Sequence, residues 1–272
     1  GKDNLPVISL LKEVRNEYDH PEHARLIGET VAETRQLAIQ AAGEACCPET
    51  LEAIWRNING NEKLVLDSLF EVGPSAIPLI EEQLKCETIS TTLKGKLIRL
   101  CGKIGGPESI KVLVVLMQTK PMFFSPVIKA LHRCKFTAPE ELKPFLENMA
   151  RQCISNGVEL LHMQKALDDQ DSQCKHLSNS LRYELEEIRE LLLCLFGCMY
   201  DKKKIDQVRF ALMARDQDSI ANAMEIIEIT VKRDIGKHFS RMFETWNVDQ
   251  RCITLHSLYK EKDFKNTGQV IA

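Results

Sequence analysis

This 272-residue chain has no long apolar run and few aromatic residues. Its longest apolar run, LLLCLFGCM at 191–199, is about half of the roughly 20 residues that a bilayer-spanning helix needs. Aromatic residues make up 6% of the chain. Proteins that bind single-stranded nucleic acid commonly stack its bases on aromatic side chains. We therefore expect neither a membrane span within this sequence nor a nucleic-acid partner.

Catalytic and metal-binding motifs are missing as well. The sequence contains no CxxC pair of the kind that holds structural zinc. Its one glycine-rich segment, GKIGGPES at 102–109, lacks the order of a phosphate-binding loop and follows a predicted helix rather than a strand. No nucleophile motif of the G-x-S-x-G type occurs. We expect no enzymatic activity, no cofactor, no metal and no small-molecule substrate.

The ten cysteines indicate a reducing compartment. Several of them fall on apolar faces of predicted helices, namely Cys101, Cys134, Cys153 and Cys194. Cys194 and Cys198 lie one helical turn apart without a histidine beside them, which favours core packing over a redox pair. The sequence therefore predicts free thiols and no disulfide. It also predicts a cytoplasmic location, either for the whole protein or as the soluble domain of an inner-membrane protein.

Charge is distributed unevenly along the chain. The whole sequence carries a net charge of −3, but residues 90–135 contain nine Lys or Arg and a single acid, Glu108. This segment has a surplus of eight positive charges, so the remainder carries −11. Such asymmetry indicates an anionic partner.

A period of 33 residues gives the fold class. Lys63, Lys96 and Lys129 stand 33 residues apart, and apolar residues repeat at the same step, for example Val65, Ile98 and Leu131. The segments VGPSAIPLIEEQL at 72–84 and GGPESIKVLVVLM at 105–117 match at that step, and FTAPEELKPFLENM at 136–149 follows at a step of 32. A fixed period of this size is typical of stacked helical hairpins. We predict an all-α solenoid with Val65, Ile98 and Leu131 in equivalent buried places.

Two resemblances extend this prediction. The hairpins at 62–150, with proline early in the first helix and a basic residue in the second, resemble HEAT repeats, which implies a HEAT/armadillo-like α-α superhelix. The stretch 181–235, with a Glu-rich helix containing Arg189, a break at Tyr200-Asp201 and ANAMEIIEI at 221–229, resembles the helical region of bacterial transporter-like proteins. In that family a nucleotide-translocase-like or major-facilitator-type membrane domain precedes HEAT repeats, often with a cyclic-nucleotide-binding domain. The resemblance implies a cytoplasmic module of a larger transporter-like protein.

Nearly every segment is predicted to be helical. An offset of 154 residues aligns 25–58 with 179–212 and suggests a duplicated three-helix unit. We expect four parts: a helical unit at 1–61, HEAT-like hairpins at 62–153, a second helical unit at 154–244 and a C-terminal helix or connector at 245–272. The segment 168–180 is the best internal loop. The expected helices are 20–42, 48–58, 62–72, 75–84, 91–104, 107–117, 124–134, 139–153, 157–168, 178–199, 203–213, 218–231 and 234–244.

A basic surface is the principal candidate site. In stacked hairpins the second helices line the concave face, where such proteins usually bind partners. We predict that this basic concave face consists of Lys63, Lys96, Arg99, Lys103, Lys129, Arg133 and Lys135. The partner would be a protein with an acidic segment, or an anionic membrane surface. The competing interpretation is a solvated polar face without a partner, as most charged helix positions are.

The cluster Asp19, His20 and His23 could in principle bind a metal, but capping of the helix that begins there explains it better. The sequence as a whole therefore predicts a non-enzymatic scaffold or regulatory binding module. It belongs either to a transporter-like membrane protein or to a free-standing cytosolic adaptor. A helical-repeat protein that binds nucleic acid is a third and weaker hypothesis.

Overall fold

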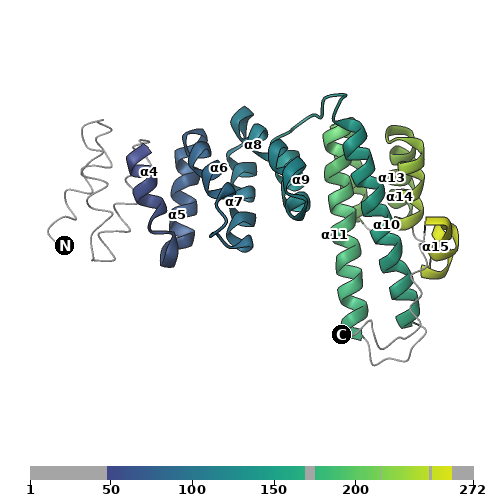
Figure 1. The fold of residues 1–272 in the computed structure, drawn as a ribbon. Helices are drawn as coiled ribbons and strands as arrows, with labels where there is room; N and C mark the ends of the chain where they lie inside the picture. Colours follow the sequence, from purple (N-terminus) through teal and green to yellow (C-terminus); the bar gives the residue numbers. More distant parts are fainter. Residues whose placement is uncertain (1–47, 169–174, 215, 245–246, 259–272) are drawn as a thin grey trace. The chain divides into compact units, whose positions relative to one another are not determined.

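The computed structural model describes residues 48–168, 175–214, 216–244 and 247–258. Within these ranges the chain consists of helices and short connections without a strand, which confirms the expected all-α class (Figure 1). The chain divides into two compact units, 1–136 and 137–272.

The first unit is a series of short helices joined by tight connections (Figure 1). Helix α7 contacts both α5 and α9, and α8 contacts α6, α7 and α9. Each helix therefore packs against neighbours close to it in sequence. The elements are α4 (Pro48–Trp55), α5 (Ile58–Val72), η3 (Gly73–Ala76), α6 (Ile77–Lys85), α7 (Thr91–Ile104), α8 (Gly106–Thr119), η4 (Pro121–Phe123) and α9 (Phe124–Arg133).

Local sequence explains where α7 begins and ends. The Ser90 side chain accepts a hydrogen bond from the Leu93 amide at 3.2 Å, which caps an otherwise unpaired N–H of the first turn. Gly105 ends the helix with φ of 71°, a left-handed conformation that glycine adopts without steric cost. Gly106 also has a positive φ, of 83°, and α8 starts there. The two glycines thus turn the chain directly from one helix into the next.

The core of the first unit follows the 33-residue step. Val65, Ile98 and Leu131 are each 0% exposed, which confirms that they occupy equivalent buried places. Burying one such side chain typically contributes about 1.5–3 kcal/mol. Ile80 and Leu113, which match at the same step, are also fully buried. The repeated apolar pattern is therefore the buried stripe of successive helices.

Helices α7 and α9 approach each other closely at Gly102 and Ala130. A Cβ atom placed on Gly102 would lie 2.8 Å from both Cα and Cβ of Ala130. Only glycine allows this approach, since real Cβ contacts are essentially never so short. The pair fixes the separation of the two helices and hence of the side chains beside them.

The second unit is organised around two long helices that lie side by side (Figure 1). Helix α10 contacts α11, α14 and α15, while α12, α13 and α14 pack in sequence order. The elements are α10 (Lys143–Asp168), α11 (Lys175–Met199), α12 (Lys202–Ala214), α13 (Gln217–Thr230), α14 (Arg233–Phe243), α15 (Val248–Leu255) and η6 (His256–Leu258).

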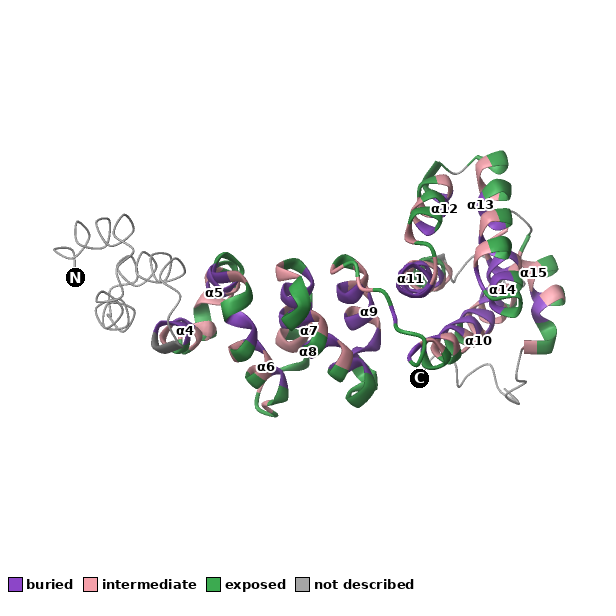
Figure 2. Cartoon of the chain, turned by 90° about the horizontal axis from the view of Figure 1, so that it is seen from above, coloured by how far each residue is buried: buried purple, intermediate pink, exposed green. Residues whose placement is uncertain are grey.

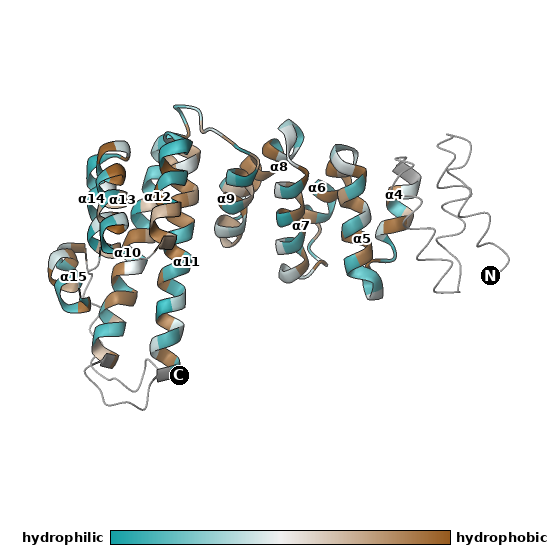
Figure 3. Cartoon of the chain, turned by 180° about the vertical axis from the view of Figure 1, so that it is seen from behind, coloured by the Kyte–Doolittle hydropathy of each residue, from teal (hydrophilic) through white to brown (hydrophobic). Residues whose placement is uncertain are grey.

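The second half of α11 is the centre of this unit. All nine residues of 191–199 are buried, on every side of the helix (Figure 2). Along α11 the side chains change from hydrophilic near Lys175 to hydrophobic near Met199 (Figure 3). The Ala138 amide also donates a 2.8 Å hydrogen bond to the Cys198 carbonyl. The longest apolar run of the sequence is thus a core helix, covered by protein.

Aromatic rings and ion pairs hold the shorter helices against α10 and α11. Phe239 of α14 stacks edge-on against Phe196 of α11, with ring centroids 5.5 Å apart. Arg151 of α10 pairs with Asp234 of α14 at 2.8 Å. Glu147, one turn earlier in α10, pairs with Lys232 at 2.6 Å. Both ion pairs join segments more than 80 residues apart in sequence.

Two predicted helix boundaries were wrong. The expected helices 139–153 and 157–168 are one helix, α10, which crosses the expected domain boundary at 153/154. A Cβ on Gly157, inside this continuous helix, would lie 2.6 Å from Sδ of Met242, so this glycine makes room for α14. Residues from 137 onward belong to the second compact unit. The expected loop 168–180 is helical from Lys175.

Several expectations lie outside the described residues: the helix 20–42, the Asp19–His23 cluster, most of the first duplicated copy at 25–58, and the part of the C-terminal connector from residue 259 onward. In the second copy, a break at 200–201 separates α11 from α12. Among the helices that are described, none combines the length and apolar character needed to cross a membrane.

Candidate functional site

Two adjoining cavities of the first unit contain most of the predicted basic face. The α5–α7 cavity has a volume of about 320 Å³ and the α7–α9 cavity about 390 Å³. Arg99 and Lys103 line both, so the two cavities meet at α7. The α5–α7 cavity is also lined by Glu62, Lys63, Leu66, Asp67, Lys96 and Leu100. The α7–α9 cavity is also lined by Ser125, Pro126, Lys129, Ala130 and Arg133.

Helical spacing places these cations together. Lys96, Arg99 and Lys103 follow one another at three and four residues on α7, so they share one face of that helix. Lys129 and Arg133 are four residues apart on α9 and likewise share a face. The close contact of Gly102 with Ala130 then brings the two faces to the same cavity.

The two cavities differ in charge. In the α5–α7 cavity, Glu62 forms an ion pair with Lys96, and Asp67 supplies a second carboxylate. The α7–α9 cavity is lined by two arginines and two lysines, Arg99, Arg133, Lys103 and Lys129, and by no carboxylate. The first cavity is partly neutralised from within, whereas the second presents an excess of positive charge.

The seven predicted residues differ in solvent exposure and in whether they line a cavity. Lys63, Arg99, Lys103, Arg133 and Lys135 are exposed. Lys96 and Lys129 are partly buried. Lys135 lines neither cavity. It follows the end of α9 with φ of 57°, a left-handed conformation uncommon for a residue with a Cβ.

Sequence reasoning missed the carboxylates of this site. Glu62 directly precedes Lys63 and is 34 residues from Lys96, with which it pairs. The same 33-residue step that aligned the lysines could have placed Glu62 beside α7. It also missed Ser125 and Pro126, which carry no charge and so gave no sign of a site.

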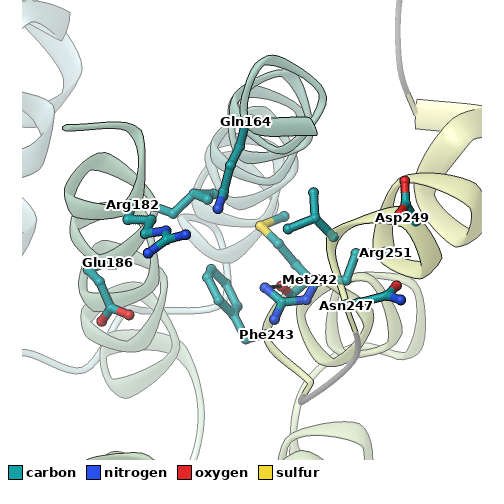
Figure 4. A pocket seen from close by; sticks show the side chains of 10 residues that line it. Gln164, Arg182, Glu186, Met242, Phe243, Asn247, Asp249 and Arg251 are labelled. Atoms are coloured by element: carbon teal, nitrogen blue, oxygen red, sulfur yellow. Dashed lines mark hydrogen bonds between the residues drawn. The ribbon is translucent and has the colours of Figure 1, made fainter. Parts of the chain in front are cut away.

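A separate cavity of about 550 Å³ lies in the second unit, between α10, α11, α14 and α15 (Figure 4). The buried residue Gln164 and the thioether of Met242 are directed toward its middle (Figure 4). Its wall also contains the guanidinium groups of Arg182 and Arg251. These residues are spread over 164–251, which explains why no sequence motif marked them.

Charges around this second cavity are largely engaged in local contacts. Glu186 pairs with Arg189, and Asp249 pairs with Lys165 at 2.8 Å. Arg251 donates a hydrogen bond to the Met242 carbonyl at 3.4 Å. Burial lowers the pKa of the Arg251 guanidinium. The cavity therefore has mixed charge that serves helix packing, in contrast to the α7–α9 cavity.

Other candidates from the sequence have structural roles. Cys194 and Cys198 are buried in the core of α11, and Arg209 donates to the Cys194 sulfur at 3.5 Å. Cys101 and Cys153 are buried as well, and all seven cysteines of the described ranges are free thiols. Within those ranges, no group of three or more His, Cys, Asp or Glu side chains is placed to hold a metal ion.

No protein-family model, curated protein or solved structure matches this chain. The geometry and charge of its own residues therefore carry the functional argument.

Proposed function

We propose that this chain is a non-enzymatic, HEAT-like helical-repeat module that binds an acidic segment of a partner protein along the two basic cavities. The main observation behind this proposal is that the two cavities share lining residues, Arg99 and Lys103. Six cations from three helices converge on two cavities that meet at Arg99 and Lys103. The six are Lys63, Lys96, Arg99, Lys103, Lys129 and Arg133.

The repeat character rests on equivalent positions. Val65, Ile98 and Leu131 are fully buried one period apart, and α7 packs between α5 and α9. In stacked hairpins each repeat contacts mainly its neighbours and leaves an extended binding surface. That arrangement suits a partner that is itself an extended chain.

The chemistry of the cavities favours an acidic peptide over nucleic acid or lipid. No aromatic side chain lines either cavity, so neither offers a platform on which a base could stack. The chain as a whole carries a net charge of −3, which opposes a long polyanion such as duplex DNA. A recessed cavity also suits side chains of an extended segment better than the flat surface of a bilayer.

The resemblance of 181–235 to transporter-like proteins supports a second part of the proposal, that the module works as the cytoplasmic part of such a membrane protein. The alternative is a free-standing adaptor with the same binding surface. The sequence of the complete gene product distinguishes them, since apolar runs of roughly 20 residues elsewhere in it would indicate membrane helices.

Binding is tested with a fluorescently labelled, glutamate-rich peptide by anisotropy. We expect saturable binding that weakens steeply as ionic strength rises toward about 0.15 M, where the Debye length is about 8 Å. The double variant Arg99→Glu/Lys103→Glu should lose binding, because both residues line both cavities. The control Lys111→Glu/Lys120→Glu makes the same charge change at exposed lysines that line neither cavity.

The outcome that supports the proposal is loss of binding in the first double variant and retention in the second. Equal binding by both double variants would reduce the cavities to a solvated polar face. Tight binding of duplex DNA, with weak binding of the peptide, would favour the nucleic-acid hypothesis instead.

A further inference from the structure

The α7–α9 cavity differs from the α5–α7 cavity in the charge of its lining, which affects the choice of ligand. Two guanidinium groups, two ammonium groups and the Ser125 hydroxyl line about 390 Å³, and no carboxylate does. The α5–α7 cavity next to it includes Glu62 and Asp67. A ligand that carries a single negative charge would leave the α7–α9 cavity with an excess of positive charge.

Backbone packing, rather than side-chain flexibility, sets this concentration of cations. Arg99 and Lys103 flank Gly102 on α7, and Lys129 and Arg133 flank Ala130 on α9. The Gly102–Ala130 contact presses the two helices together at the level of these four residues. The positive charges of Arg99, Lys103 and Arg133, which line this cavity, repel one another unless an anion lies between them. The helices thus prepare a site before any ligand arrives, which lowers the cost of ordering it on binding.

We propose that the α7–α9 cavity binds the phosphate monoester of a phosphorylated side chain within the acidic segment. This inference rests on the proposed function and names the ligand of one part of the same site. A phosphate monoester carries a charge of about −1.5 to −2 at pH 7 and three strong acceptor oxygens. Guanidinium groups bind phosphate through paired N–H donors, and lysines add point charges, as this lining provides.

The neighbouring cavity would then receive ordinary carboxylates or backbone of the same segment. The carboxylates of Glu62 and Asp67 disfavour a dianion there, while Lys63 still attracts single negative charges. The two cavities therefore have different roles. The α5–α7 cavity attracts an acidic chain in general, and the α7–α9 cavity selects for phosphate.

The experiment compares three peptides of identical sequence, in which glutamates flank a central serine, phosphoserine or glutamate. Affinities for the intact chain are measured by anisotropy in a phosphate-free buffer. We expect the phosphopeptide to bind about tenfold or more tightly than the serine peptide, with the glutamate peptide close to the serine peptide.

Variants then locate the preference. Arg133→Gln and the double variant Lys129→Gln/Arg133→Gln change residues that line only the α7–α9 cavity. They should remove most of the phosphopeptide preference and leave the serine peptide bound. Of these two cavities, Lys63 lines the α5–α7 cavity alone, and Lys63→Gln should weaken all three peptides by a similar factor. Circular dichroism confirms folding, and Arg133 is exposed, so the single variant provides the test if the double variant unfolds.

Equal affinity for the phosphopeptide and the serine peptide would overturn this inference while the proposed function stands. Retention of the full preference in Arg133→Gln and the double variant would also overturn it, since the phosphate would then bind elsewhere. Failure of all three peptides to bind would overturn the proposed function and this inference together.

Discussion

The described part of the first unit, from residue 48, is built from helices of 8 to 15 residues, whereas the second unit is organised around helices of 26 and 25 residues. In the first unit each short helix buries one stripe against its neighbours, so the same pattern returns every 33 residues. In the second, 191–199 is buried on all sides by other helices and by the segment that precedes α10. A repeated amphipathic pattern thus accompanies stacking, and a continuous apolar run accompanies complete burial.

The two units also use surface charge differently. In the second unit, cations and carboxylates from distant segments pair with each other, as in Arg151–Asp234 and Lys232–Glu147. In the first unit, the segment 90–135 has a single acid, so its cations have few carboxylates of their own repeats to pair with. Four of these cations line one cavity. In the second unit, paired charges of opposite sign contribute to helix packing. In the first unit, the surplus of positive charge leaves a surface suited to an anionic partner.

The largest expected effect tests how far the second unit depends on its aromatic contacts. Phe239 is 0% exposed, and its ring lies 4.9 Å from that of Phe243 and 5.5 Å from that of Phe196, between centroids. Phe239→Ala should lower the free energy of unfolding by about 3–5 kcal/mol. Urea unfolding measures it, with Phe210→Ala as control, since Phe210 is 72% exposed and should change stability by less than about 0.5 kcal/mol. A similar loss in both variants would refute this account of the core.

The next effect contrasts a partly exposed thiol of the first unit, Cys86, with a buried thiol of the second, Cys153. The pKa of Cys86 is lowered, chiefly by its hydrogen bond with the Thr88 hydroxyl, whereas burial raises the pKa of Cys153 to about 11. Because the thiolate is the reactive form, Cys86 should react with a maleimide about a hundredfold faster or more at pH 8. Timed labelling with peptide mapping measures both sites. Comparable rates would mean that the second unit opens readily.

A smaller effect tests the close approach that shapes the α7–α9 cavity. Gly102→Ala should destabilise the chain by about 1–3 kcal/mol, because the new Cβ would meet backbone of Ala130 that cannot move away freely. Gly95→Ala, on the same helix with nothing within 4 Å, should instead stabilise it by about 0.5–1 kcal/mol. Thermal unfolding of both variants provides the measurement. Two stabilised variants would show that α7 and α9 are farther apart than described.

How much the sequence could predict follows from the same contrast between the units. The period of 33 placed Val65, Ile98 and Leu131 correctly, because short-range stacking repeats the local environment along the chain. The predicted break between helices 139–153 and 157–168 was wrong. The reason for Gly157 is Met242 in a helix 85 residues later, and the spacing of residues in the sequence does not reveal that contact.

The candidate site shows the same division. The cations of the basic face could be selected from their spacing and charge, and six of the seven line the two cavities. Lys135 could not be excluded beforehand, because the left-handed turn after α9 depends on the end of that helix rather than on the repeat. The pairing of Glu62 with Lys96 depends on side-chain reach between two helices, which the pattern of residue types does not give.

The smallest expected effect is a pH dependence within the second unit. Burial lowers the pKa of His162 below its ordinary value of 6.5, and His256 and Lys165 nearby act in the same direction. The unfolded chain therefore binds a proton more readily than the folded chain in the window below pH 6.5, so this group makes stability fall as pH falls through that window. His162→Gln cannot take up the proton, and it should show a smaller decrease in Tm than the wild type when pH is lowered from neutral to about one unit below 6.5. His176→Gln, at an exposed position near the start of α11, controls for the substitution itself. Identical pH profiles for the wild type and His162→Gln would mean that burial of this imidazole has no influence on folding.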